Sequence, residues 1–270
     1  MTEPHTKAPA NGERIAKRLA RAGVCSRREA ERLIEARRVA VDGVVLDSPA
    51  LNVTPNQLIT VDGAPIPDAE PTRLWRFHKP AGLVTTHRDP EGRPTVFDQL
   101  PEDMPRVISI GRLDLNSEGL LLLTNDGALA RHLELPQTGW VRRYRVRAFG
   151  SVTEAKLEAL LAGVEVDGMT FRAESASLDR STRANSWLTL GLREGKNREV
   201  RRMLEAVDLT VTRLIRVAYG PFQLGQLKRG AVEEVKGKVL AEQVGKSRLG
   251  PRRPRRSDKK QSGTQQKGRP

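Results

Sequence analysis

The sequence has few of the features that mark secreted, membrane-spanning or metal-binding proteins. Its 270 residues contain a single cysteine, Cys25, and no cluster of cysteine and histidine residues, which excludes an internal disulfide and disfavours a structural metal site. No apolar run approaches the ~20 residues that span a bilayer. The first eleven residues lack the apolar core of a secretory signal. We therefore expect a cytoplasmic protein without a bound metal.

Positive charge dominates the composition. Lys and Arg number 47 against 33 Asp and Glu, which gives a formal net charge of +14. A charge of this size and sign favours a polyanionic partner, with nucleic acid ahead of an anionic membrane surface. Residues 246–270 hold ten basic side chains and one acidic side chain among many Pro, Gly, Ser and Gln residues. We expect this segment to be a disordered basic tail.

The first folded segment carries an uneven charge. After a flexible tail at residues 1–11, apolar spacing predicts one helix over residues 13–22, and Ser26 predicts the cap of a second helix that runs to about Arg38. From Arg14 to Arg38 there are nine basic residues and three glutamates, which favours a phosphate-binding face over an ordinary solvated one. The candidates for RNA contact are Arg14, Lys17, Arg18, Arg27, Arg28, Arg32, Arg37 and Arg38.

Residues 12–62 resemble the small S-four RNA-binding domain, which is named for a ribosomal protein. The resemblance rests on the Ser-Arg-Arg-Glu-Ala run at residues 26–30 and on the Val-Asp-Gly turn at residues 41–43, which also predicts a β-hairpin. A segment with three prolines follows at residues 63–73 and predicts a semi-rigid linker. The resemblance implies a small α/β RNA-binding domain in front of a second domain.

The second domain, expected at residues 74–245, carries one aspartate in a prominent position. Asp114 stands on a short polar loop between the apolar runs 107–110 and 120–123, both of which read as buried strands. Loop aspartates are more often turn residues than catalytic ones, so position alone does not assign a role. A longer polar loop at residues 85–105 holds His87, Arg88 and Arg93, which suit phosphate contact and an ordinary surface equally.

Two further residues lie in strongly basic surroundings. Tyr144 belongs to the segment 142–147, where residues alternate as in a strand with one basic face. Arg201 belongs to the segment 193–204, where four cations gather at the start of a predicted helix. A helix dipole opposes cations at that end, which indicates that they serve a partner. Each residue taken alone also fits an ordinary structural role.

As a set, these segments resemble the Rsu-type pseudouridine synthases, whose members pair an S-four domain with such a second domain. The resemblance covers residues 12–245 and departs from the usual pattern where Arg142 replaces a lysine and Asn116-Ser117 replaces Asp-Thr. We interpret the second departure as a mark of the large-subunit, RluB-like branch. The motifs are Gly-Arg-Leu-Asp at 111–114, Gly-Leu-Leu-Leu-Leu-Thr-Asn-Asp-Gly at 119–127, His-Lys-Pro-Ala-Gly at 78–82, Arg-Arg-Tyr-Arg-Val at 142–146 and the basic run at 195–203.

The resemblance implies an α+β fold with a mixed, largely antiparallel sheet flanked by helices, and an enzyme that isomerises uridine in ribosomal RNA without a cofactor. It implies that Asp114 is the catalytic carboxylate and that Tyr144 stacks on the base and transfers a proton. It makes Arg201 a cation that lowers the aspartate pKa by roughly 1–3 units. Leu214, rather than Ile215, fits the apolar contact. The remaining substrate contacts are expected from Arg112, Lys196 and Arg198.

The expected partner is ribosomal RNA or a pre-ribosomal particle, bound by a monomer. Three alternatives stay open: a small-subunit (16S) synthase, a non-catalytic ribosome-assembly factor, and a metal-dependent nuclease. The assembly factor does not explain a carboxylate in a basic surface. The nuclease needs clustered carboxylates, and Asp126, the nearest second one, reads as a turn or helix cap. The sequence does not decide whether the catalytic aspartate acts as a nucleophile or removes a proton from C2′.

Overall fold

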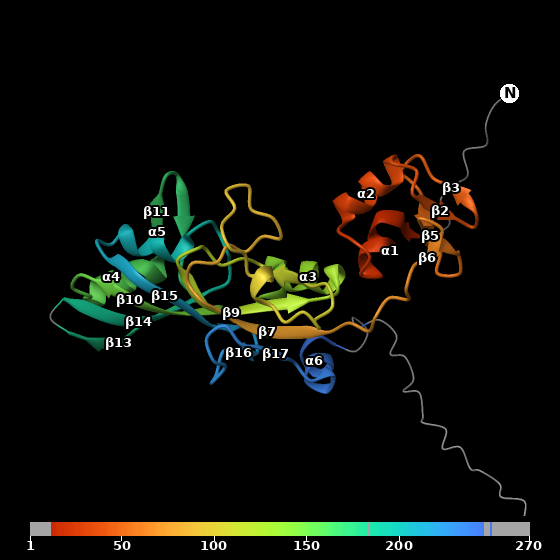
Figure 1. Ribbon diagram of the computed structural model, residues 1–270. Coiled ribbons are helices and arrows are strands. Elements are labelled where there is room, and N and C mark those ends of the chain that lie inside the picture. The colour runs from red at the N-terminus through yellow and green to blue at the C-terminus, as the bar shows by residue number, and fades with distance from the viewer. Residues whose placement is uncertain (1–11, 183, 246–248, 250–270) are drawn as a thin grey trace, which may run out of the picture.

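The computed structural model describes residues 12–182, 184–245 and 249, which form two folded parts joined by an extended segment (Figure 1). We call residues 12–66 the N-terminal part and residues 72–245 the C-terminal part. The tails expected at residues 1–11 and 246–270 lie outside the described residues, apart from Leu249. No helix within the described ranges is long and apolar enough to cross a membrane.

The N-terminal part packs two helices against short strands. Ser26 caps α2 as expected, because its hydroxyl oxygen accepts the Glu29 N–H over 3.1 Å. The helix is shorter than the sequence predicts, since Arg37 adopts a left-handed φ of 56° that ends it. The elements are β1 (Glu13–Arg14), α1 (Ile15–Arg21), α2 (Arg27–Glu35), β2 (Val39–Val41), β3 (Val44–Val45), β4 (Asn52–Val53), β5 (Ile59–Val61) and β6 (Ala64–Pro65).

A small core and a tight hairpin hold this part together. The core centres on the fully buried Ile15, Leu19 and Ile34. The expected hairpin joins β2 to β3 through Asp42 and Gly43, whose φ values of 50° and 84° match a type I′ turn. Strand β6 pairs with β5, so the sheet continues into the beginning of the segment expected as a linker.

The C-terminal part is built on one nine-stranded sheet in the order β13-β14-β10-β15-β9-β7-β17, with β16 paired to β15 and β8 paired to β9. Every neighbouring pair is antiparallel except β9 and β15, which confirms a mixed, largely antiparallel sheet. The strands are β7 (Leu74–Lys79), β8 (Ile108–Ile110), β9 (Ser117–Thr124), β10 (Arg142–Phe149), β13 (Ser175–Ser181), β14 (Asn185–Leu192), β15 (Thr210–Tyr219), β16 (Phe222–Gln223) and β17 (Val232–Glu234).

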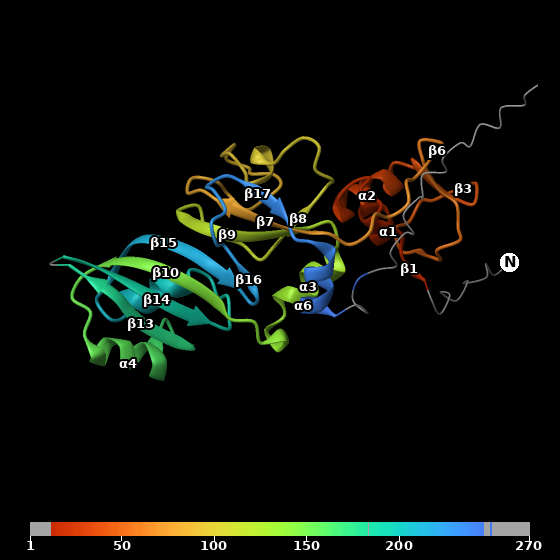
Figure 2. The same cartoon turned by 90° about the horizontal axis from the view of Figure 1, so that it is seen from below.

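Helices flank this sheet at two ends. Figures 1 and 2 both place α4 at one end and α3 with α6 at the other, beside the N-terminal part. The remaining elements are η1 (Phe97–Gln99), α3 (Gly127–Glu134), η2 (Pro136–Thr138), α4 (Glu154–Ala162), β11 (Val164–Val166), β12 (Met169–Phe171), α5 (Glu199–Glu205) and α6 (Gly237–Val244).

Strand β9 is buried along its whole length because it serves two hydrophobic cores. Leu121 and Leu123 pack into the core that contains α4 and α5, whereas Leu120 and Leu122 pack into the core that contains α3 and α6. Each fully buried leucine stabilises the fold by about 1.5–3 kcal/mol. The strand therefore gives the loop in front of it a rigid base.

The two parts meet at the turn between β9 and α3. The Arg21 guanidinium of α1 donates to the main-chain oxygen of Asn125 over 3.3 Å and to the Thr72 hydroxyl over 3.2 Å. It also lies 3.6 Å from the carboxylate of Asp126. The Asn125 side chain accepts the Arg73 N–H over 2.9 Å, which ties the end of the connecting segment to the same turn.

Candidate active site

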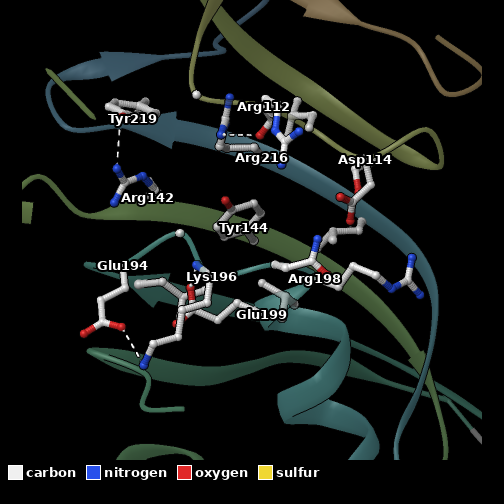
Figure 3. A pocket seen from close by; sticks show the side chains of 18 of the residues that line it. Arg112, Asp114, Arg142, Tyr144, Glu194, Lys196, Arg198, Glu199, Arg216 and Tyr219 are labelled. Carbon is white, nitrogen blue, oxygen red and sulfur yellow. Dashed lines mark hydrogen bonds and ion pairs between the residues drawn. The ribbon is translucent and has the colours of Figure 1, made fainter. Parts of the chain in front are cut away.

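A cleft of about 840 Å³ opens where the loop after β8, the starts of β9 and β10, the end of β15 and the segment before α5 meet. This volume lies within the usual range for small-ligand sites, ~300–1,000 Å³. The predicted site residues that line the cleft are Arg112, Asp114, Tyr144, Lys196, Arg198 and Leu214. Residues that the sequence places 100 positions apart thus share one hollow (Figure 3).

Asp114 stands on the loop between β8 and β9, where the sequence predicts it. Its main-chain oxygen accepts the Ser117 N–H over 3.0 Å, which closes a tight turn at the start of β9. Beyond that turn, β9 runs unusually close to β15. A Cβ on Gly119 would lie 2.3 Å from the main-chain oxygen of Arg216, and the φ of Gly119 is 103°. Only glycine fits here, and the close approach fixes the loop against β15.

The buried side chain of Lys79 supports this loop from beneath. Its ammonium donates to the main-chain oxygens of Pro80 (3.0 Å), Asp114 (3.1 Å), Leu115 (3.3 Å) and Ser117 (2.8 Å). Burial lowers the pKa of Lys79 to about 8, although the negative charge of Asp114 opposes the shift. The sequence analysis did not assign this role. The feature that could have indicated it is a lysine at the end of an apolar strand.

Asp114 differs from the other acidic residues of the cleft, each of which has a partner. Glu134 accepts the Gly111 N–H over 2.7 Å, Glu194 pairs with Lys196 over 2.7 Å, and Glu199 accepts the Lys196 N–H over 3.1 Å. The carboxylate of Asp114 makes no hydrogen bond or ion pair with any residue that the structure describes. It is the carboxylate available to a ligand in this cleft.

Tyr144 lies at the centre of the cleft on β10 (Figure 3). The strand alternates strictly between buried and exposed residues, as predicted, and Tyr144 takes a buried position with 9% of its surface exposed. Leu214 lines the cleft from β15, whereas its neighbour Ile215 packs into the core around α3 and α6. Strand alternation therefore places Leu214 on the cleft side and Ile215 on the opposite side.

Arg201 lies beside the cleft without lining it. Its guanidinium donates to the main-chain oxygens of Asn116 (3.2 Å) and Val211 (3.3 Å), and it forms no ion pair with Asp114 in the described chain. Burial lowers the pKa of Arg201 and the charge of Arg198 adds to this, whereas Asp114 opposes it. Arg201 therefore does not make the adjacent contact with Asp114 that the sequence suggested, and it reaches the Asp114 loop through the main chain of Asn116.

The basic residues before α5 differ in how far they are engaged. Lys196 donates to the Thr170 oxygen over 2.8 Å and pairs with Glu194. Arg198 has a left-handed backbone, with φ 49° and ψ 32°, and its side chain has no partner among the described residues. Such strain in a non-glycine residue is frequent at functional sites. Arg112 is exposed and its guanidinium is likewise unpaired within the described ranges.

Sequence analysis did not assign a role to two buried arginines in the cleft. Arg142 donates to the Tyr219 hydroxyl over 2.9 Å and lies over its ring at 4.8 Å. Arg216 donates to the Leu120 oxygen over 2.7 Å, and its Nη2 is buried without a partner in the described residues. Both residues occupy positions of their strands that alternation turns toward the interior, and this alternation was the feature of the sequence that could have identified them. No group of three or more metal-binding side chains occurs in the described residues.

The eight predicted RNA contacts of the N-terminal part are engaged to different degrees. Lys17, Arg32 and Arg38 pair with Glu13, Glu29 and Asp62 over 3.2, 3.6 and 2.6 Å, and Arg14 donates to the Ala50 oxygen. The Arg18 Nε is buried without a partner in the described chain. Arg27, Arg28 and Arg37 are exposed. The positive charges of these last three residues are therefore the most accessible to a ligand.

Comparison with known proteins matches both parts. Residues 73–206 match the model of the RNA pseudouridylate synthase family, and residues 13–59 match that of the S4 domain. An uncharacterized RNA pseudouridine synthase of Rickettsia felis is 49% identical over 84% of this chain and 99% of its own. The ribosomal large subunit pseudouridine synthase B of Escherichia coli (strain K12) is 45% identical over 83% of this chain and 79% of its own.

A solved structure supports the fold. A crystal structure of a pseudouridylate synthase superposes with a TM-score of 0.60 at 24% identity, over 85% of this chain and 98% of that one. At this identity the likeness concerns the fold alone. The sequence matches and the shared fold together show that this chain belongs to the RNA pseudouridine synthase family and carries an S-four domain in front of its catalytic domain.

Proposed function

We propose that this enzyme converts one uridine of large-subunit (23S) ribosomal RNA into pseudouridine, with Asp114 as the catalytic residue. The observation that carries the proposal is the Asp114 carboxylate, which lies in an open, basic cleft without a partner among the described residues. The choice of large-subunit RNA rests on the 45% identity to the large subunit pseudouridine synthase B of Escherichia coli.

The reaction is an isomerisation, so its atoms balance without a co-reactant. The bond between N1 and C1′ breaks, the uracil turns, and C5 forms the new bond to C1′. The proton on C5 leaves and N1 gains a proton. Asp114 acts on the nucleotide at the first stage, and an ionised carboxylate is the form that attacks or accepts a proton. The hydroxyl of Tyr144, whose ring stacks on the base, takes part in the later proton transfer.

The target base must leave its stack to reach Asp114, which costs a few kcal/mol. The cleft offers groups that offset this cost. Leu214 gives an apolar contact to the flipped base, and Arg112, Lys196 and Arg198 bind the phosphates around it. Arg201 adds a positive charge beside the Asp114 loop and holds Asn116 in place. The side chains named for these roles come from the β8–β9 loop, from β15, from the segment before α5 and from α5 itself.

The S-four domain binds the same RNA, in ribosomal RNA or a pre-ribosomal particle. The basic surplus lies on and next to its helices α1 and α2, and the exposed arginines without a partner among the described residues are Arg27 and Arg28 in α2 and Arg37 just after it. The enzyme works as a cytoplasmic monomer in this proposal. Its charge is that of a protein whose affinity for RNA falls as salt rises.

The test is the Asp114→Asn variant, assayed on 23S and 16S ribosomal RNA purified from cells that lack this protein. Asn is nearly isosteric but cannot act as a nucleophile or base, so we expect pseudouridine formation in 23S RNA to vanish while RNA affinity stays within about threefold. Asp47→Asn, which changes an exposed carboxylate of the S-four domain, is the matched control and should keep wild-type turnover. Full activity of Asp114→Asn would contradict the mechanism. Modification of 16S RNA alone would contradict the choice of substrate.

A further inference from the structure

A second groove, of about 680 Å³, lies between the S-four domain and the catalytic domain. The S-four domain contributes α2 and the residues before it. The catalytic domain contributes β8 and the long loop between β7 and β8, which reaches toward α2 in Figure 1. The groove is separate from the catalytic cleft, and the two hollows have no lining residue in common. The family matches and the proposed chemistry assign no role to it.

The charge of this groove is strongly positive. Arg28 and Arg32 line it from α2, and Arg88 and Arg106 line it from the catalytic domain. The one acidic residue in the lining is Glu29, which lies 3.6 Å from Arg32. The side chains of Arg28, Arg88 and Arg106 have no hydrogen-bonding or ion-pair partner in the part of the chain that the structure describes. Unpaired guanidinium groups from both domains thus face the same groove.

Another arginine of the same loop shows that this arrangement is selective. Arg93 donates twice to Asp89, at 2.8 and 3.1 Å, and lies 3.0 Å from Glu91, so its charge is already neutralised. Arg93 does not line the groove. The loop therefore satisfies one arginine internally and leaves Arg88 to face the groove. If the loop were only a solvated surface, there would be no reason for Arg93 to be paired and for Arg88 to be left unpaired in the groove.

The groove also contains an aromatic platform. The rings of His87 and Phe97 are stacked, with centroids 3.6 Å apart and an angle of 14° between their planes. Both residues line the groove. Desolvation and the neighbouring charge of Arg106 lower the pKa of His87, so the imidazole is neutral at neutral pH. Single-stranded nucleic acids bind where a positive groove follows the backbone and aromatic rings stack on the bases.

The groove is mechanically connected to the catalytic loop. Thr85 lines the groove, and its hydroxyl donates to the Leu113 oxygen over 2.8 Å and accepts the Leu113 N–H over 3.3 Å. Leu113 lines the catalytic cleft and directly precedes Asp114. Ile108 and Ser109 of β8 also line the groove, and the same strand leads into the Asp114 loop. One short segment therefore has the groove at one end and the catalytic residue at the other.

We infer that the interdomain groove binds an unpaired stretch of the substrate RNA that flanks the target uridine. Phosphates lie against Arg28 and Arg32 on one side and against Arg88 and Arg106 on the other, while a base stacks on the His87–Phe97 pair. This inference rests on the proposed function, because it takes ribosomal RNA as the substrate. RNA bound in this way touches both domains at once and fixes their relative orientation while the uridine occupies the cleft.

The first test removes one guanidinium from each wall in the full-length double variant Arg28→Gln/Arg106→Gln. The control is Arg180→Gln/Lys238→Gln, which removes two exposed charges from β13 and α6, away from both hollows. Binding of 23S RNA is measured by filter retention across a salt series, and turnover by pseudouridine formation. We expect the slope of log affinity against log salt to fall by about 1.4, since each phosphate contact to a single strand contributes roughly 0.7. KM should rise at least tenfold while kcat stays within threefold.

The second test separates stacking from charge. His87→Ala should weaken RNA binding by roughly 5- to 150-fold, the usual range for loss of one stacked base, and His87→Phe should restore it. The inference is overturned if the double variant matches its control in salt slope and KM, or if His87→Ala binds as tightly as wild type. These failures differ from failure of the proposed function, which would show as absence of pseudouridine formation by the wild-type enzyme on 23S RNA.

Discussion

The ammonium group of Lys79 donates a hydrogen bond to the main-chain oxygen of Asp114 over 3.1 Å. The same group donates to the main-chain oxygens of Leu115 and Ser117, which follow Asp114, and to that of Pro80, its own neighbour in the chain. A charge buried within the protein is costly unless hydrogen bonds satisfy it, and here the turn from Asp114 to Ser117 supplies three of the four acceptors. Lys79 therefore fixes the position of the loop that carries Asp114, and the Asp114 side chain needs no partner to hold the loop in place.

Replacement of Lys79 by methionine should abolish this support. The methionine side chain fills most of the space but donates nothing, so four buried or partly buried carbonyls lose a donor, at up to about 1–3 kcal/mol for each one left unsatisfied. We expect kcat to fall more than tenfold with RNA affinity unchanged, because the loop moves while Arg112 and the S-four domain still bind RNA. Single-turnover kinetics and filter binding measure the two effects. A variant with unchanged kcat would show that the loop keeps its position without Lys79.

The same contact predicts how activity depends on pH. Burial lowers the pKa of Lys79 from 10.5 to about 8, so the ammonium form is present below pH 8 and is lost as the pH rises above it. Because the neutral amine has only two N–H donors for four carbonyls, the hydrogen bonds that hold the Asp114 loop become weaker. We therefore expect kcat to fall on the alkaline side with an apparent pKa of about 8. A kcat that is constant from pH 7 to pH 9.5 in single-turnover assays would contradict this.

The close approach of β9 and β15 gives a prediction about stability. In Gly119→Ala the new Cβ would lie 2.3 Å from the Arg216 oxygen, so the two strands must separate. We expect a loss of at least about 2 kcal/mol in the free energy of unfolding, measured with urea. Gly111→Ala is the matched control. It has a positive φ of 66° but nothing within 4 Å of its Cβ, and should cost only the ~1 kcal/mol of backbone strain. Equal losses in the two variants would contradict the steric argument.

Much of the site could be predicted from the sequence because its signals are local. The Asp114 loop lies between two apolar runs, and the alternation around Tyr144 fixes which side chains face inward. The sheet class followed from the same patterns together with the family resemblance. Leu214 was preferred over Ile215 on the family resemblance alone, and strand alternation explains why the structure places the two side chains on opposite faces.

The remaining features depend on contacts between segments that are distant in the sequence. Three of the four carbonyls bound by Lys79 lie 35 to 38 residues away from it. Arg201 reaches the Asp114 loop through Asn116, 85 residues away. The sequence grouped Arg88 with Arg93, and only the folded loop shows that Arg93 is paired with Asp89. The interdomain groove requires that two domains be docked, which no local pattern specifies.

The last prediction concerns the junction between the domains, where the two carboxylate oxygens of Asp126 bind different partners. One oxygen caps α3 by accepting the Ala128 N–H over 2.8 Å. The other accepts the Thr72 hydroxyl over 2.6 Å and lies 3.6 Å from Arg21 of the S-four domain. Asn is as good a helix cap as Asp, whereas Ala is a poor one.

Asp126→Ala should therefore lower the free energy of unfolding by about 0.5–2 kcal/mol, with a smaller loss in Asp126→Asn. Both variants remove the charge that attracts Arg21, so both should increase amide hydrogen exchange in α1 and in the segment that contains Thr72. Arg21→Gln is the complementary control, because it breaks the same junction and leaves the cap of α3 intact. It should increase amide exchange in α1 as the Asp126 variants do, without the loss of helix-cap stability that Asp126→Ala causes. If Arg21→Gln leaves α1 protected, the junction is held by other contacts and the ion pair to Asp126 does not orient the S-four domain.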